Sequence, residues 1–177
     1  MHLFVEFNDS TFTEMLPEIL SSCANVSFMI ESIDNVEEIG VKRRNVMIFA
    51  SNFQSLSSLF GLMTSTKFAL DGFYTIVMQT ISDDNASRVF RSFWKKFLYN
   101  VNIITMSEDD GCVVMKTFLP FRENACHQSN PIVIKEFHEK WNGKDFFPYK
   151  FKSFHNCTIR AGTFEYAPAV IRSENDE

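Results

Sequence analysis

The feature that most constrains the fold is a helix-forming stretch between two apolar runs, within residues 73–106. The runs "FYTIVMQ" and "VNIITM" are rich in β-branched and aromatic residues and are typical of buried strands. A strand–helix–strand unit of this kind closes right-handed with its strands parallel. The apolar residues of the intervening "SDDNASRVFRSFWKKFLY" recur at helical spacing and form one face: Ala86, Val89, Phe90, Phe93, Trp94, Phe97 and Leu98.

Further stretches extend this unit in both directions. Helical spacing predicts helices in "STFTEMLPEILSSC", where Pro17 would kink or restart the helix, and in "SNFQSLSSLFGLM", which Ser51 can cap. Strands are expected in "HLFVEF", "VSFMI", "NVMIFA" and "CVVMKTF", the last antiparallel because the tight turn "SEDDG" precedes it. We therefore expect an α/β layered domain, with a mostly parallel sheet and flanking helices, like half of a periplasmic-binding-like fold.

The character of the chain changes after residue 119, which suggests three parts. Residues 1–119 are expected to form the α/β domain, and the loop-like residues 120–157 a C-terminal connector with one short helix or strand. Alternation in 159–163, followed by the turn Tyr166-Ala167-Pro168, predicts the opening strand of a further domain over residues 158–177.

Charge and hydropathy exclude several classes of partner. The formal net charge is −5 and no basic stripe stands out, which argues against binding to nucleic acid or to an anionic membrane surface. No apolar run approaches the 20 or so residues of a membrane span, and the start "MHLFVEFNDS" lacks the features of a signal peptide. Read literally, these features predict a soluble cytosolic chain.

Cysteines and sequons favour the secretory pathway instead. The four cysteines, Cys23, Cys112, Cys126 and Cys157, are compatible with two disulfides in three possible connectivities. Four N-x-S/T sequons, about twice the chance expectation, lie at Asn8, Asn25, Asn85 and Asn156. Both observations suggest an extracellular glycoprotein.

No arrangement of residues supports catalysis, so we expect neither an enzyme nor a cofactor. The glycines form no phosphate-binding loop, and no G-x-S-x-G elbow occurs. The adjacent pair Cys126 and His127 could suggest a metal site or a thiol enzyme, but neighbours in sequence usually point apart. His138 and His155 are lone residues beside aromatics, so no metal site is expected.

Binding remains possible at the carboxyl ends of the parallel strands. Ligands of open α/β sheets enter there, at the point where the strand order reverses. In this chain the corresponding loops are Ala50–Asn52 and Thr80–Asp84. Two ordinary capped helix starts would explain the same residues equally well.

Four segments in a particular order carry a resemblance to a known family. They are "FWKKFLYNVNIITM", "MKTFLPF" with the following Cys126, "WNGKDFFPYKFKSFHNC" and "IRAGTFEYAPAVI". Over residues 88–171 the chain resembles the extracellular N-terminal region of divergent insect ionotropic receptors, chemosensory relatives of ionotropic glutamate receptors. The resemblance implies a truncated part of a ligand-gated cation channel, without its pore, on the extracellular side of the cell membrane. It also implies a small-molecule ligand and co-receptor subunits as partners.

The resemblance further implies roles for individual residues. Cys157 would be the linker cysteine and would pair with Cys126, which leaves Cys23 and Cys112 as buried thiols. Asn156 stands where the family often has glycine, and asparagine also tolerates a left-handed backbone. Residues 158–177 would begin the ligand-binding lobe. The alternative is a free-standing soluble α/β module that binds a small molecule.

Overall fold

A seven-stranded sheet forms the body of the computed structural model. The structure describes residues 1–6, 14, 17–18, 21, 27–32, 36, 40–106, 112–137 and 146–159, and the statements below concern these. The strand order is β2-β1-β3-β4-β5-β6-β9. The strands are β1 (His2–Val5), β2 (Met29–Ser32), β3 (Arg43–Phe49), β4 (Phe68–Val77), β5 (Asn100–Met106), β6 (Val113–Thr117) and β9 (Ile132–Phe137).

Five neighbouring strands are parallel and the last two are antiparallel. β2, β1, β3, β4 and β5 pair in parallel, while β6 pairs antiparallel with β5 and with β9. The expected α/β fold with a mostly parallel sheet is therefore confirmed, including the parallel β4–β5 unit and the antiparallel strand after "SEDDG". After β1, the chain forms β2 on one side of β1 and then β3 on the other side of β1. The strand order therefore reverses between β1 and β3.

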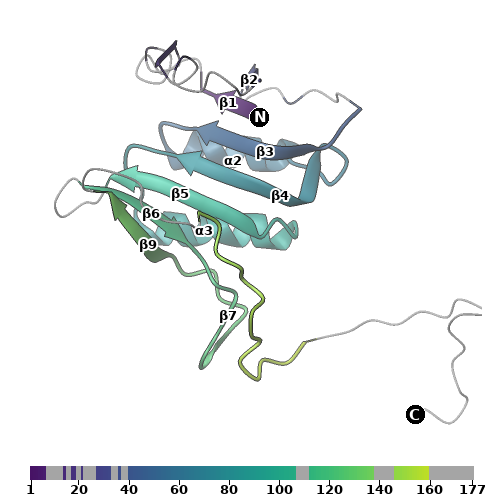
Figure 1. Cartoon of the computed structure of the whole chain (residues 1–177), viewed down its shortest axis with the longest axis vertical. Helices are drawn as coiled ribbons and strands as arrows, with labels where there is room; N and C mark the ends of the chain where they lie inside the picture. The colour runs from purple at the N-terminus through teal and green to yellow at the C-terminus, as the bar shows by residue number, and fades with distance from the viewer. Residues whose placement is uncertain are drawn as a thin grey trace, which may run out of the picture.

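Two helices cover one face of this sheet. α2 (Phe53–Leu62) and α3 (Asp83–Lys95) lie side by side behind the strands in Figure 1. Both crossovers, β3–α2–β4 and β4–α3–β5, join parallel neighbours through a helix. The core between helices and sheet is rich in aromatic rings, which bury large areas: Phe4, Phe68, Tyr74, Phe90, Phe93 and Phe118.

The expected apolar face of α3 is confirmed over most of its length, with one correction at its end. Ala86, Val89, Phe90 and Phe93 are buried against the sheet. Phe97, however, lies beyond the helix and is 71% exposed. The helix ends at Lys95, so the helical spacing that would place Phe97 on the buried face no longer applies there.

The cap of α2 also needs a correction. Asn52, rather than Ser51, is the N-cap, and its side-chain oxygen accepts a hydrogen bond from the Ser55 N–H. The Ser51 hydroxyl instead donates a hydrogen bond to the Glu6 carboxylate. Of the earlier helix predicted in "STFTEMLPEILSSC", only Glu14, Pro17, Glu18 and Ser21 are described, and all four are helical.

The sheet continues beyond the boundary expected at residue 119. The sequence places residues 132–137 in the connector, whereas the structure pairs them with β6 as the edge strand β9. The physical reason is that β6 alone at the edge would leave a row of backbone N–H and C=O groups unpaired. The rest of the three-part division stays a prediction, because residues 160–177 lie outside the described part.

A small hairpin and a docked segment complete the described structure. β7 (Phe121–Arg122) and β8 (Ala125–Cys126) form a two-stranded hairpin. Residues 146–159, here called the docked segment, run beside this hairpin below the sheet, shown yellow-green in Figure 1. Its described residues 154–159 form no strand. In the part of the chain that is described, no helix is long and apolar enough to cross a membrane.

Two glycines give a test of this packing. Gly72 lies in β4, where an added Cβ would approach the backbone oxygen of Arg44 to 2.7 Å and the hydroxyl of Tyr74 to 2.9 Å. That hydroxyl is buried and donates to the Ala69 oxygen at 2.5 Å, so it cannot move freely. We expect Gly72→Ala to lower the free energy of unfolding by about 1–3 kcal/mol, measured by urea denaturation.

Gly61 in α2 is the matched control. An added Cβ there meets nothing within 4 Å, and alanine is the better helix former. Gly61→Ala should therefore raise the free energy of unfolding by about 0.5–1 kcal/mol. Equal effects of the two substitutions would contradict the packing described around Gly72.

Candidate functional site

The first candidate site lies at the carboxyl ends of β1 and β3, where the strand order reverses. Glu6 directly follows β1, and Ser51 follows β3. The Glu6 carboxylate accepts hydrogen bonds from the Ser51 N–H at 2.9 Å, the Ser51 hydroxyl at 2.6 Å and the Ser55 hydroxyl at 2.6 Å. The structure thus brings the predicted loop Ala50–Asn52 together with a carboxylate that the sequence did not single out.

These hydrogen bonds decide the charge of the site. Burial acts to raise the pKa of Glu6, but the bonds from Ser51 and Ser55 outweigh it and lower the pKa overall. A carboxylate at the electropositive N-terminus of α2 is favourable, and it fills the position where an anionic ligand would otherwise bind. The site is therefore better suited to a neutral or cationic group than to an anion.

The second predicted loop, Thr80–Asp84, forms the start of α3. Ser82 is the N-cap, and its hydroxyl accepts from the Asn85 N–H. Asp83 is exposed and pairs with Lys116 of β6 at 2.9 Å. Capping and an ion pair account for both residues, so this loop matches the capped helix start that the sequence left open.

A disulfide ties the hairpin to the docked segment. The structure joins Cys126 to Cys157, with their Cα atoms 5.5 Å apart, which is the pairing that the resemblance implies. Cys126 is thus not available as a thiol nucleophile. The Nε2 of the neighbouring His127 lies 3.1 Å from the Thr158 oxygen and adds a second link between the same two segments. Cys112 is half-buried just before β6, and Cys23 lies outside the described residues.

A buried lysine anchors the docked segment to the sheet. Lys150 is only 3% exposed, and its Nζ donates to the Thr117 hydroxyl at 2.9 Å and the Val101 oxygen at 3.4 Å. The same nitrogen lies 3.8 Å from the ring centroid of Phe118. Both acceptors are neutral. Burial therefore holds the pKa of Lys150 well below its usual range.

An aromatic pocket that is partly open to solvent, here called the aromatic cavity, lies where the end of α3, the hairpin and the docked segment meet. Its volume is about 790 Å³, within the roughly 300–1,000 Å³ of typical ligand pockets. The lining rings are close to one another: Phe121 and Phe154 have centroids 5.0 Å apart, and Phe121 and Trp94 6.2 Å apart. The described lining residues are Trp94, Phe97, Phe121, His127, Phe151, Phe154, Thr158 and Ile159.

Phe97 holds its place in this lining by a costly backbone conformation. Its φ is 60°, in the left-handed region, and it closes α3 in a Schellman motif. The Phe97 N–H donates to the Trp94 oxygen at 2.9 Å, and the Leu98 N–H to the Phe93 oxygen at 3.0 Å. Glycine is the usual residue at this position, and a larger one costs about 1–2 kcal/mol.

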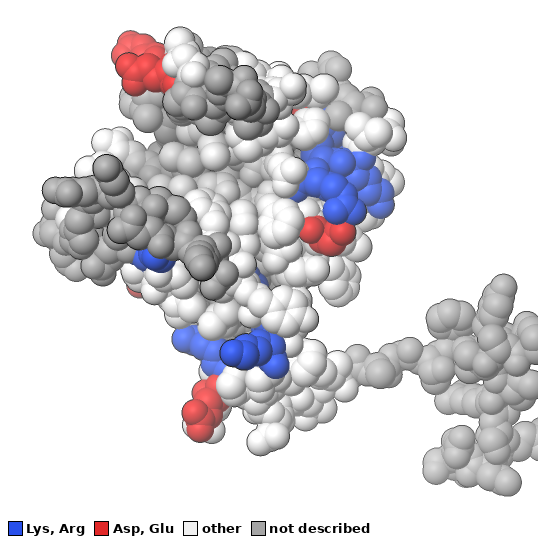
Figure 2. All heavy atoms as spheres, viewed as in Figure 1, with Lys and Arg blue, Asp and Glu red and all other residues white. Residues whose placement is uncertain are grey.

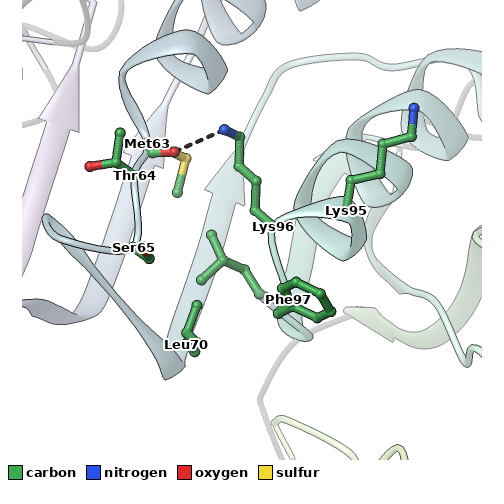
Figure 3. Close-up of a pocket in the computed structure, with 8 residues that line it drawn as sticks. Met63, Thr64, Ser65, Leu70, Lys95, Lys96 and Phe97 are labelled. Carbon is green, nitrogen blue, oxygen red and sulfur yellow. Dashed lines mark hydrogen bonds between the residues drawn. The ribbon is translucent and has the colours of Figure 1, made fainter. Parts of the chain in front are cut away.

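A second, smaller pocket lies on the other side of Phe97. It has a volume of about 400 Å³ and is lined by the ends of α2 and α3 and by β4. Figure 3 shows Lys96 reaching across it to the Met63 oxygen, a bond of 2.9 Å, while the Lys95 ammonium points away. Because Lys96 satisfies the C-terminal end of α2, its ammonium already has a structural role.

The remaining sequence predictions fall in different places. Two of the sequon asparagines are described: Asn156 is exposed, and Asn85 is half-buried in α3. The φ of Asn156 is 60°, the left-handed backbone that asparagine tolerates in place of glycine. His155 is exposed, and Asn8, Asn25 and His138 lie outside the described residues. Within the described ranges, no three His, Cys, Asp or Glu residues come close enough to hold a metal ion.

Charges on the surface are grouped rather than continuous. On the face seen in Figure 2, Lys and Arg form separate groups, and neutral side chains cover much of the described surface between them. A mostly parallel α/β sheet with a strand-order reversal is compatible with ligand binding at the carboxyl ends of its strands.

Comparison with known proteins gives the family. Residues 2–153 match the family described as "Putative ionotropic receptor, ligand binding domain". No match was found among curated proteins or among solved structures. Since the match spans most of the chain, the chain belongs to the family of ionotropic receptor ligand-binding domains. The expected membership of the ionotropic receptors is thus confirmed, and a ligand-binding domain implies that a small molecule is bound.

Lys150 gives a pH-dependent test of the docked segment. Folding lowers the pKa of Lys150 from its usual value of about 10.5. At any pH between the folded-state pKa and about 10.5, Lys150 therefore carries a proton in the unfolded chain but not in the folded chain. Its destabilising effect is therefore full below the folded-state pKa and falls as the pH rises toward 10.5. We expect the free energy of unfolding to rise between pH 7 and pH 9.5, measured by urea denaturation.

Substitution separates this effect from other titrations. Lys150→Met keeps the apolar stem but removes the charge, so it should raise stability at pH 7 and flatten the rise. Lys152→Met, at an exposed position two residues away, should leave the pH profile as in the wild type. A rise that survives in Lys150→Met would show that another group causes it.

Proposed function

We propose that this chain is the extracellular ligand-binding region of a chemosensory ionotropic receptor, a ligand-gated cation channel that acts with co-receptor subunits. The observation that carries the proposal is the family match over residues 2–153. The matched residues include the site around Glu6 and most of the aromatic cavity, whose remaining lining residues are Phe154, Thr158 and Ile159. The order of sequence segments that resembles insect chemosensory receptors supports the sensory role.

The chemistry of the described part is consistent with extracellular ligand binding. The disulfide Cys126–Cys157 needs an oxidising compartment, which the outside of the cell provides. The sequons at the exposed Asn156 and the half-buried Asn85 offer acceptors for N-glycans, although the bonded Cys157 in the middle of the first would hinder its use. The role proposed for the domain is to bind a small molecule and to pass that signal to a pore formed elsewhere in the receptor.

Secretion of the chain from eukaryotic cells tests this proposal. Intact mass is measured before and after deglycosylation and reduction, on a product directed to the secretory pathway by an added signal peptide. We expect at least one N-glycan and a Cys126–Cys157 bridge, because the proposed compartment supplies both modifications. Thr158→Ala removes the sequon at Asn156 but keeps the asparagine, so it assigns that glycan.

Two results would count against the proposal. A secreted product with no glycan and with Cys126 and Cys157 as thiols would contradict an extracellular role. Strong protection of residues 160–171 from hydrogen exchange, as expected for a strand paired with the sheet, would favour the free-standing binding module instead.

A further inference from the structure

We propose that the aromatic cavity is the binding site for a small, neutral, aromatic molecule. Nothing described so far requires this site, because ligands of parallel α/β sheets bind at the carboxyl ends of the strands. The cavity instead lies between the end of α3, the hairpin and the docked segment. The proposal rests on the proposed function and adds to it the chemical class of a ligand.

The walls of the cavity favour an uncharged, aromatic occupant. None of the described lining residues is Asp, Glu, Lys or Arg. A charged ligand would lose part of its hydration there without an opposite charge from these residues in return. Aromatic rings on several sides allow edge-to-face and offset contacts, which a flat ligand can extend. Among the described lining residues His127 and Thr158 are polar, and the His127 Nε2 is bonded to the Thr158 backbone oxygen.

The cavity is held open before any ligand arrives. The disulfide Cys126–Cys157 links the hairpin to the docked segment. Lys150 bonds the docked segment to Thr117 of β6. The Phe151 ring packs with its centroid 4.9 Å from that of Tyr99, just before β5. Because these attachments fix the walls, a ligand does not have to order them, and this reduces the entropic cost of binding.

The backbone at Phe97 gives an independent reason to assign a function to this place. A phenylalanine occupies the left-handed position that normally carries glycine, and its ring remains 71% exposed. Stability alone would favour glycine there. Strained, exposed residues of this kind concentrate at binding sites, and the Phe97 ring lines the cavity.

The test measures binding of a neutral fluorescent dye to the oxidised chain. N-phenyl-1-naphthylamine becomes brighter in apolar surroundings, so a saturable rise in its fluorescence reports binding. We expect benzyl acetate, which is neutral and aromatic, to displace the dye, and octanoate, an aliphatic anion, to leave it bound. Absence of saturable binding, or equal displacement by both compounds, would overturn the proposal.

Three substitutions locate the dye. Phe97→Gly removes the ring and relieves the backbone, so we expect the Kd of the dye to rise roughly three- to tenfold while the Tm rises. Phe154→Ala should also raise the Kd, since it removes another wall. Tyr149→Ala is the control, because Tyr149 is an exposed aromatic residue of the docked segment that does not line the cavity.

Because Phe97→Gly should fold more stably than the wild type, weaker binding in this variant cannot be attributed to unfolding. Unchanged dye binding in Phe97→Gly and Phe154→Ala would overturn the proposal. A second result would also overturn the proposal. If analytical ultracentrifugation showed that Phe97→Gly turns a dimer into a monomer while dye binding is unchanged, the exposed rings would be the contact with a second copy of the chain. Either failure would leave the glycan and disulfide test of the proposed function unaffected.

Discussion

Burial of one face of the parallel sheet under α2 and α3 is the contact on which the remaining structure depends. Aromatic rings make up much of this layer, and they form a nearly continuous series. Phe4 and Phe68 have ring centroids 5.8 Å apart, and Tyr74 and Phe93 5.7 Å apart. At the end of α3 the Trp94 ring lies 6.0 Å from Phe118 and leads into the aromatic cavity. The core and the cavity are therefore parts of one aromatic packing arrangement, so a change in one is expected to affect the other.

Much of the body could be predicted from the sequence because its signals are local. The apolar face of α3 and the strands on either side follow from periods of 3.6 and 2 residues, which depend only on neighbours in the chain. The helical connection between them then makes β4 and β5 parallel. The loop Ala50–Asn52 was found in the same way, since it follows a clear strand. Glu6 was missed although it directly follows the apolar run of β1, a signal that could have indicated it.

Apart from the Cys126–Cys157 bridge, which the resemblance implies, the docked segment and its cavity could not be predicted, because their contacts join residues far apart in the sequence. Lys150 is bonded to Thr117 and Val101, and no local pattern distinguishes a buried lysine from an exposed one. β9 lies in a stretch with loop-like neighbours, and pairing with β6 decides its conformation. The one local clue was the end of α3, where "KKFLY" offers no glycine and Phe97 takes the left-handed position.

Residues 146–159 belong to the ligand-binding body and are not a loose tether. Chemical acetylation of lysines in the folded, oxidised chain, with each site quantified by mass spectrometry, tests this most directly. Lys150 is buried and Lys152 is exposed, although only one residue separates them. We expect Lys152 to be acetylated rapidly, while Lys150 stays unmodified until the protein unfolds. Equal rates at the two lysines would contradict it.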